Sequence, residues 1–207
     1  MERIGIYGGS FDPIHFGHLL FAESAREFCG LDRIVFVPAG IPPHKRNKKQ
    51  TSGNDRFQMI QLAIQAYPEY SASRFEIDSD EISYTVRTLR YFHELNPKSQ
   101  LFLIIGSDMF NDIPNWFEPQ EICRLASLVV TQKADEPPLD FARFEPLVSS
   151  DKILEFQRQI VPMPKLELSS TKIRNNLAKG KSIRFQLPSS VEQYIIENQL
   201  YANKELT

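Results

Sequence analysis

Apolar runs alternate with amphipathic stretches along most of the chain. Four runs are almost continuously apolar, which is typical of strands whose two sheet faces are both covered by helices. They are residues 3–8, 33–37, 101–105 and 128–130. Helical spacing of apolar residues marks 19–28, 56–66, 86–95, 171–178 and 189–199. The alternation predicts an α/β fold, a Rossmann-like doubly wound parallel sheet that binds ligands beyond the carboxyl ends of its strands.

Two stretches have no clear period. Residues 38–54 are rich in proline, glycine and basic residues and are predicted to form a long loop, which is often functional. Residues 132–157 indicate only a short helix near 152–158 and no chemistry. We expect one domain, 1–207, whose C-terminal part from about 169 to 203 is a small helical subregion.

The composition is that of an ordinary globular protein, with a net charge of -2 and a pI near 6.1. This balance argues against a nucleic-acid-binding protein. Cys29 and Cys123 are far apart, so neither a zinc site nor a disulfide framework is indicated. No apolar run approaches the roughly 18 to 20 residues of a membrane span, and no signal-peptide pattern opens the chain. We therefore expect a cytoplasmic protein without membrane contact.

The first candidate for chemistry is the segment GGSFDPIHFGH, residues 8–18, which follows the first predicted strand. Its glycines allow a sharp turn close to a ligand, and the following helix offers N–H groups and the positive end of its dipole. Phosphate is the natural ligand of such a turn. His15 and His18 add donors that titrate near neutral pH, which indicates phosphoryl or nucleotidyl transfer. The alternative is metal ligation by the two histidines and Asp12.

A second candidate lies far downstream, where Ser170 and Thr171 open a helix with Lys172 and Arg174 in its first turn. One interpretation is a plain N-cap with solvated charges. The other is that the N–H groups, the hydroxyls and the Arg174 guanidinium hold a polyphosphate. If both helix N-termini face one site, they would hold a triphosphate from two sides.

Two more segments are weaker candidates. In the basic run 44–49, His44 and Lys45 directly follow a stiff Ile-Pro-Pro segment and are best placed to face a ligand, although a solvated loop explains the run equally well. Trp116, the only tryptophan, lies in a polar, proline-broken stretch. Ring stacking on a base is one hypothesis for it, and ordinary packing is the other.

Taken together, these motifs resemble the nucleotidylyltransferase superfamily of the (T/H)xGH type, and specifically bacterial nicotinate-nucleotide adenylyltransferases. The resemblance covers nearly the whole chain. Its motifs are GGSFDPIHFGHL at 8–19, PPHK at 42–45, SYT at 83–85, GSD at 106–108 with Trp116, and SSTKIR at 169–174. It implies an enzyme that joins ATP and nicotinate mononucleotide to give deamido-NAD and pyrophosphate, with Mg²⁺ held mainly by ATP phosphates and water.

The resemblance also implies residue roles. The ATP site would comprise Gly8, Gly9, Ser10, Phe11, His15, His18, Gly106, Asp108, Ser170, Thr171 and Arg174. The mononucleotide would contact His44, Lys45, Tyr84, Thr85 and Trp116. His15, His18 and Arg174 would be the catalytic donors, and no protein metal ligand is expected. The attacking phosphate monoester is already unprotonated at cytosolic pH, so in-line attack on the ATP α-phosphate needs no general base.

The chain departs from the family pattern in two places. Arg87 stands where the family commonly has Asp, and Gln132-Lys133-Ala134 stands where it commonly has Arg-Pro-Gly. Three alternatives stay open: transfer to nicotinamide mononucleotide, transfer to another acceptor such as phosphopantetheine, and a non-catalytic nucleotide-binding module. Whether the chain forms a homo-oligomer is also open.

Overall fold

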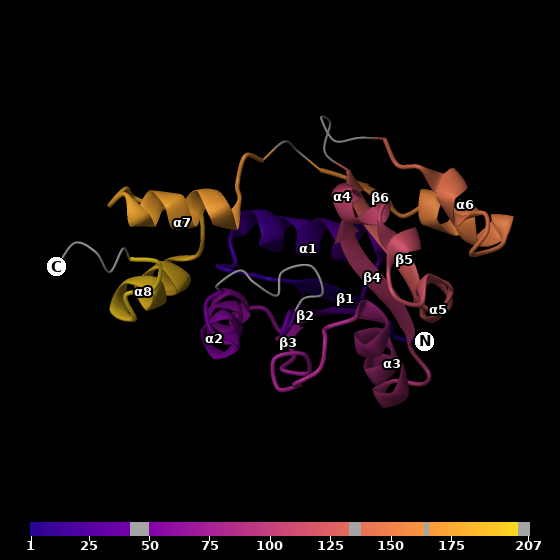
Figure 1. Cartoon of the computed structure of the whole chain (residues 1–207), viewed down its shortest axis with the longest axis horizontal. Coiled ribbons are helices and arrows are strands. Elements are labelled where there is room, and N and C mark those ends of the chain that lie inside the picture. Colours follow the sequence, from indigo (N-terminus) through magenta and orange to yellow (C-terminus); the bar gives the residue numbers. More distant parts are fainter. Residues whose placement is uncertain (42–49, 133–137, 164–165, 203–207) are drawn as a thin grey trace.

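A computed structural model describes residues 1–41, 50–132, 138–163 and 166–202. Its centre is a six-stranded sheet in the order β3-β2-β1-β4-β5-β6, in which every strand pair is parallel (Figure 1). The strands are β1 Arg3–Gly9, β2 Arg33–Pro38, β3 Tyr70–Ala72, β4 Gln100–Gly106, β5 Ala126–Gln132 and β6 Ile160–Pro162. The predicted Rossmann-like α/β fold is confirmed. The strand order reverses between β1 and β4, which places a ligand site beyond their carboxyl ends.

Helices cover both faces of the sheet and create two apolar cores. They are α1 Phe16–Cys29, α2 Gly53–Ile64, α3 Thr85–Leu95, α4 Ser107–Phe110, α5 Pro119–Leu125, α6 Ser150–Gln157, α7 Ser170–Ala178 and α8 Ser189–Glu197, with 3₁₀ turns η1 Ile113–Asn115 and η2 Phe141–Phe144. Residues of α1, α2, α7 and α8 pack on one face, and residues of α3, α5 and α6 pack on the other. Successive strand residues enter opposite cores, as in Ile34 and Val35, because a strand alternates its side chains.

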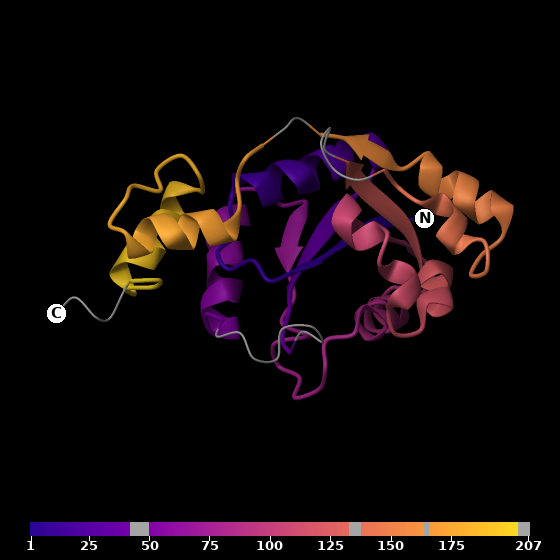
Figure 2. The same cartoon turned by 45° about the horizontal axis from the view of Figure 1, so that its top comes forward.

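The C-terminal helices extend the first core beyond the edge of the sheet. In Figures 1 and 2, α7 and α8 lie at the end of the molecule next to α1 and α2, opposite α5 and α6. Ile173, Val191 and Ile195 are buried in the core that α1 and α2 share. The Ser190 hydroxyl donates to the Leu62 carbonyl at 3.0 Å, which fixes α8 against α2. None of the described helices has the length and hydrophobicity that a bilayer-spanning segment requires.

Several short elements were not predicted. The strands β3 and β6 have three residues each, and α4, α5 and both 3₁₀ turns are also short. The four long strands and five of the predicted helices are confirmed with ends shifted by a few residues, and the short helix expected near 152–158 is α6. His44 and Lys45 lie outside the described residues, as do Lys133 and Ala134.

Candidate active site

The turn after β1 is anchored in the core by Phe11. Its φ of 47° lies in the left-handed region, and its ring is 1% exposed. The ring packs edge-on against Tyr7 at 5.2 Å and Phe36 at 5.6 Å between centroids. The Phe11 side chain therefore shapes the turn from inside, while Gly8 is exposed and Gly9 and Ser10 are half-buried.

His15 and His18 lie face to face at the N-terminus of α1. Their ring centroids are 3.8 Å apart and the rings are inclined by 18°. The His15 backbone N–H donates to Nδ1 of His18 at 3.3 Å, so a neutral His18 carries its proton on Nε2. Gly17 makes this stack feasible, because a Cβ there would lie 2.9 Å from Cε1 of His15. His15 is 5% exposed and His18 is half-buried, so His18 is the more accessible donor.

Not every N–H group at this helix end is available to a ligand. The Phe16 N–H donates to the Gln186 carbonyl at 3.0 Å. The segment before α8 therefore occupies one of the groups that the sequence analysis assigned to a phosphate. The imidazoles and the preceding turn remain the candidate phosphate-binding groups at this helix end.

The carboxyl end of β4 lies beside this turn. β1 and β4 are parallel neighbours, and Gly106 ends β4 directly before Ser107 and the exposed Asp108. Burial, and after it the Asp108 carboxylate, raise the pKa of the Tyr7 hydroxyl, which places Asp108 close to β1. The two strand ends that the sequence analysis selected therefore border one region at the reversal of strand order.

The N-terminus of α7 contacts the same turn. The Ser170 hydroxyl donates to the Pro13 carbonyl at 2.9 Å, and Nη1 of Arg174 donates to the Asp12 carbonyl at 2.6 Å. Nη2 of Arg174 also reaches the Thr171 hydroxyl at 3.4 Å. The residues joined by the Ser170 and Arg174 bonds are 157 and 162 positions apart in the sequence, yet the two candidate segments are in direct contact.

Aromatic rings lie in the segments that the sequence analysis assigned to the mononucleotide. Tyr84 and Thr85, both half-buried, form the start of α3, and the Tyr84 ring lies 4.7 Å from the exposed ring of Phe117. Trp116 is half-buried, and its Nε1 donates to Asp112 at 3.2 Å. The sequence analysis did not single out Phe117, and its only signal was a second aromatic residue beside Trp116.

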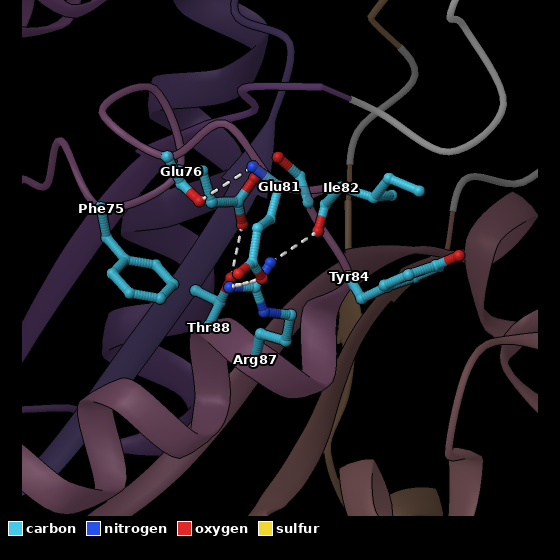
Figure 3. Close-up of a pocket in the computed structure, with 9 residues that line it drawn as sticks. Phe75, Glu76, Glu81, Ile82, Tyr84, Arg87 and Thr88 are labelled. Carbon is cyan, nitrogen blue, oxygen red and sulfur yellow. Dashed lines mark hydrogen bonds and ion pairs between the residues drawn. The ribbon is translucent and has the colours of Figure 1, made fainter.

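A buried carboxylate fixes the loop that carries Tyr84 and Thr85 (Figure 3). Glu76 is 9% exposed and accepts a 2.5 Å hydrogen bond from the Thr88 hydroxyl. The Ser83 hydroxyl accepts the N–H groups of Gly40 and Ile41, both at 3.1 Å. A Cβ on Gly40 would overlap the Glu76 carbonyl oxygen, so only glycine fits here. The loop before α3 is thereby held against the segment that follows β2.

Arg87 is one of the departures from the family pattern, and its side chain faces away from the Tyr84 ring. Its guanidinium forms an ion pair with Glu81 and donates to the Ile82 carbonyl at 3.2 Å. In Figure 3 it turns toward these two residues, whereas the Tyr84 ring points to the opposite side. The charge of Arg87 is thus compensated within its own loop.

The sequence analysis also missed Arg56, which connects the turn after β1 to the segments that flank residues 42–49. This side chain belongs to a residue that is 3% exposed, and it donates to three backbone carbonyls. Nη1 reaches Ser10 at 2.9 Å, Nη2 reaches Ala39 at 2.7 Å, and Nε reaches Thr51 at 3.1 Å. One planar guanidinium therefore fixes the turn after β1 relative to the segments on either side of residues 42–49.

The buried Glu76 predicts a pH effect on stability with a defined sign. Burial, opposed by hydrogen bonds and by Arg56, raises the pKa of Glu76 above its ordinary value of 4.5. Because the unfolded chain loses this proton at a lower pH than the folded protein, the free energy of unfolding falls as pH rises above about 4.5. Glu76→Gln should abolish that fall. Urea unfolding of both proteins across a pH series measures the difference.

Glu121→Gln is the matched control, because the pKa of Glu121 is shifted in the opposite direction and its effect on the free energy of unfolding has the opposite pH dependence. Arg124, hydrogen-bonded to Glu121, is the main cause that lowers the pKa of this carboxyl. Its stabilising contribution is present above pH 4.5 and is lost as pH falls below that value. The two variants should therefore differ from wild type in opposite directions and in different pH ranges. A difference for Glu76→Gln that does not change with pH would contradict the assignment.

The described residues contain no cluster of three histidine, cysteine, aspartate or glutamate side chains arranged to hold a metal ion. The geometry instead combines stacked imidazoles, a glycine turn and a cationic helix N-terminus at the reversal of strand order of a parallel sheet. Fold and site together define an α/β protein of the nucleotidyltransferase class.

Comparison with known proteins agrees with this class and narrows it. The cytidylyltransferase-like family matches residues 6–176. Two relatives named probable nicotinate-nucleotide adenylyltransferase, from Desulfitobacterium hafniense and a Synechococcus species, are each 40% identical to the chain over 97% of its length, and the matches cover 96% and 97% of the relatives. The chain belongs to the cytidylyltransferase-like family, and within it to the nicotinate-nucleotide adenylyltransferases. The resemblance drawn from the motifs is confirmed.

Solved structures support the fold independently. The nicotinic acid mononucleotide adenylyltransferase of Plasmodium falciparum, complexed with NaAD, superposes with a TM-score of 0.74 at 22% identity and covers 97% of this chain and 98% of its own. The same protein complexed with APC gives a TM-score of 0.73 at 21% identity. The superposition covers 97% of the chain, so the overall fold follows a known arrangement.

Proposed function

We propose that this enzyme transfers the adenylyl group of ATP to nicotinate mononucleotide and releases deamido-NAD and pyrophosphate. Family membership over 97% of the chain supports the reaction. The single structural observation that supports it is the contact of Ser170 and Arg174 with residues 12 and 13, because this contact brings the start of α7 to the turn before α1, where donors from both segments would reach one triphosphate. We also propose that the whole chain acts as one domain, and that it works in the cytoplasm, where ATP is abundant.

The proposed mechanism needs no general base. The phosphate of the mononucleotide has a second pKa near ~6 and already carries its nucleophilic oxygen unprotonated. The obstacle is repulsion between two polyanions. Holding both in line contributes roughly 7 to 11 kcal/mol, and each preorganised donor to the developing charge contributes roughly 3 to 4 kcal/mol.

We assign the donor roles to His15, His18 and Arg174. Nε2 of His18 is the best placed, because Nδ1 is already engaged by the His15 N–H. Gly8, Gly9 and Ser10 would follow the ATP phosphates with their backbone, and Thr171 would add a hydroxyl. Gly106 and Asp108 would meet the ribose and adenine. Mg²⁺ would neutralise phosphate charge, held by ATP oxygens and water.

On the mononucleotide side we assign Tyr84, Thr85 and Trp116, and we add the exposed Phe117 ring as part of the stacking surface. A nicotinate carboxylate requires N–H donors, whereas the nicotinamide amide also requires an acceptor. The Tyr84 N–H already donates to the Ile82 carbonyl at 2.8 Å, so the first-turn N–H groups of Thr85 and Val86, which have no intrahelical acceptor, are the donors that would favour the acid. Arg87 contributes little to this choice because Glu81 compensates it.

The test is pyrophosphate release from ATP and Mg²⁺ with each pyridine mononucleotide in turn. We expect kcat/KM for the nicotinate mononucleotide to exceed that for the nicotinamide mononucleotide by about tenfold or more, because an unmatched buried polar group costs roughly 1 to 3 kcal/mol. Equal values would contradict the proposed specificity. If no pyrophosphate were released with either mononucleotide, the proposed reaction would be contradicted. ATP binding without turnover would identify a non-catalytic binding module.

A further inference from the structure

Asp12 is a buried acid in the middle of the proposed phosphate-binding turn. It is 5% exposed and lies between the core residue Phe11 and Pro13. Its backbone carbonyl accepts from Arg174. Its carboxylate faces elsewhere: Oδ2 accepts the Thr51 N–H at 3.4 Å, and Oδ1 accepts the Tyr201 hydroxyl at 2.6 Å.

The Tyr201 bond is the shorter of the two carboxylate bonds, and it comes from the C-terminal end of the described chain. A buried carboxylate requires strong donors, and bonds to charged groups are among the strongest hydrogen bonds in proteins. Tyr201 has a left-handed φ of 63°, and its ring and Leu200 pack against the core formed with α1 and α2. The Leu200 N–H donates to the Ile195 carbonyl at 2.9 Å, so the end of α8 holds this segment in place.

Other charges near Asp12 do not replace this contact. The side chain of Arg56 gives its donors to three backbone carbonyls, and Arg174 donates to the Asp12 carbonyl and to Thr171. Within the described residues, Tyr201 is therefore the side-chain donor that meets the Asp12 carboxylate at short distance. Asp12 lies only three residues before His15, so the position of its backbone constrains the position of the stacked imidazoles.

We propose that Tyr201 is a positioning residue: through its hydrogen bond to Asp12 it orders the turn that carries His15 and His18. The kinetic part of this proposal rests on the proposed function. The ordering itself does not, because it is a property of the turn whether or not the enzyme turns over.

Tyr201→Phe tests the proposal, and Tyr194→Phe is its matched control. Tyr194 also lies in the C-terminal part, and its hydroxyl donates to another aspartate, Asp55 on α2, at 2.8 Å. Each variant loses one hydroxyl and one tyrosine–aspartate hydrogen bond, but only Tyr201 contacts the turn. We expect Tyr201→Phe to lower kcat/KM for ATP about tenfold, and Tyr194→Phe to leave it unchanged.

Amide hydrogen exchange gives a second readout that needs no activity. In Tyr201→Phe, peptides covering residues 9–18 should exchange faster, whereas Tyr194→Phe should leave them protected as in wild type. If wild type released no pyrophosphate with either mononucleotide, the proposed function would fail while the exchange result still decided this proposal. Equal exchange and equal kinetics in the two variants would overturn it.

A double-mutant cycle shows whether the effect passes through Asp12. Asp12→Asn weakens the acceptor of the Tyr201 hydroxyl, so adding Tyr201→Phe to it should cost clearly less than tenfold in kcat/KM. Full additivity would show that Tyr201 acts by another route and would overturn the assignment. Should Asp12→Asn fail to fold, the comparison of the two tyrosine variants decides alone.

Discussion

Replacing His18 by alanine is expected to lower kcat about a hundredfold or more while the protein stays folded. The imidazole is half-buried, and its Nδ1 is occupied by the His15 N–H, so Nε2 is the donor that alanine removes. Loss of one preorganised donor to the developing phosphate charge has an effect of this size. Because the donor acts mainly in the transition state, the KM for ATP should change much less than kcat.

Initial rates of pyrophosphate release at saturating ATP and mononucleotide measure this effect. His93→Ala is the control, because His93 is a half-buried histidine in the last turn of α3, away from the stacked rings. It should retain wild-type turnover. Near-normal turnover of His18→Ala, with a circular dichroism spectrum like that of wild type, would reject the donor role.

Replacing Arg56 by methionine should destabilise the protein by about 3 to 5 kcal/mol. Methionine fills similar space but leaves the carbonyls of the half-buried residues Ser10, Ala39 and Thr51 without their donor. Arg56→Lys should recover only part of the loss, because an ammonium group cannot reproduce three bonds from a planar fork.

Urea unfolding at neutral pH measures this loss as a lower midpoint with a similar slope. The control is Arg74→Met, which removes an exposed arginine paired with Asp78 at 2.7 Å. A surface ion pair contributes little, so this variant should unfold close to the wild-type midpoint. If both variants unfolded at the same urea concentration, the carbonyl bonds of Arg56 would not be structural.

The long elements were predictable because their patterns are long. Strands such as β1 and β4 are buried on both faces and read as continuous apolar runs. The edge strands β3 and β6 have only three residues each, and in β3, with the sequence YSA, no residue is fully buried. No periodicity can be detected in so few positions. Their place in the sheet depends on the neighbouring strand, which sequence spacing does not contain.

Only the parts of the site that form a short, contiguous sequence motif could be predicted. The turn 8–18 and the start of α7 carry glycines, histidines and hydroxyls in a recognisable order, and their mutual contact is consistent with the expectation that they face one ligand. Arg56, Glu76 and Tyr201 carry no such signal. Arg56 bonds backbone carbonyls, which every residue has, and Tyr201 bonds a carboxylate 189 residues away. Long-range partners of single polar residues are not encoded in local spacing.

The distances in sequence between Asp12 and its partners also set an order of assembly. A ribosome synthesises the histidine turn before the residues that contact Asp12, which lie 162 and 189 positions further along. Until those positions have left the exit tunnel, Asp12 lacks its hydrogen bonds from Arg174 and Tyr201. A product truncated within α8 would lack Tyr201, so its Asp12 carboxylate would lose the hydrogen bond from that hydroxyl.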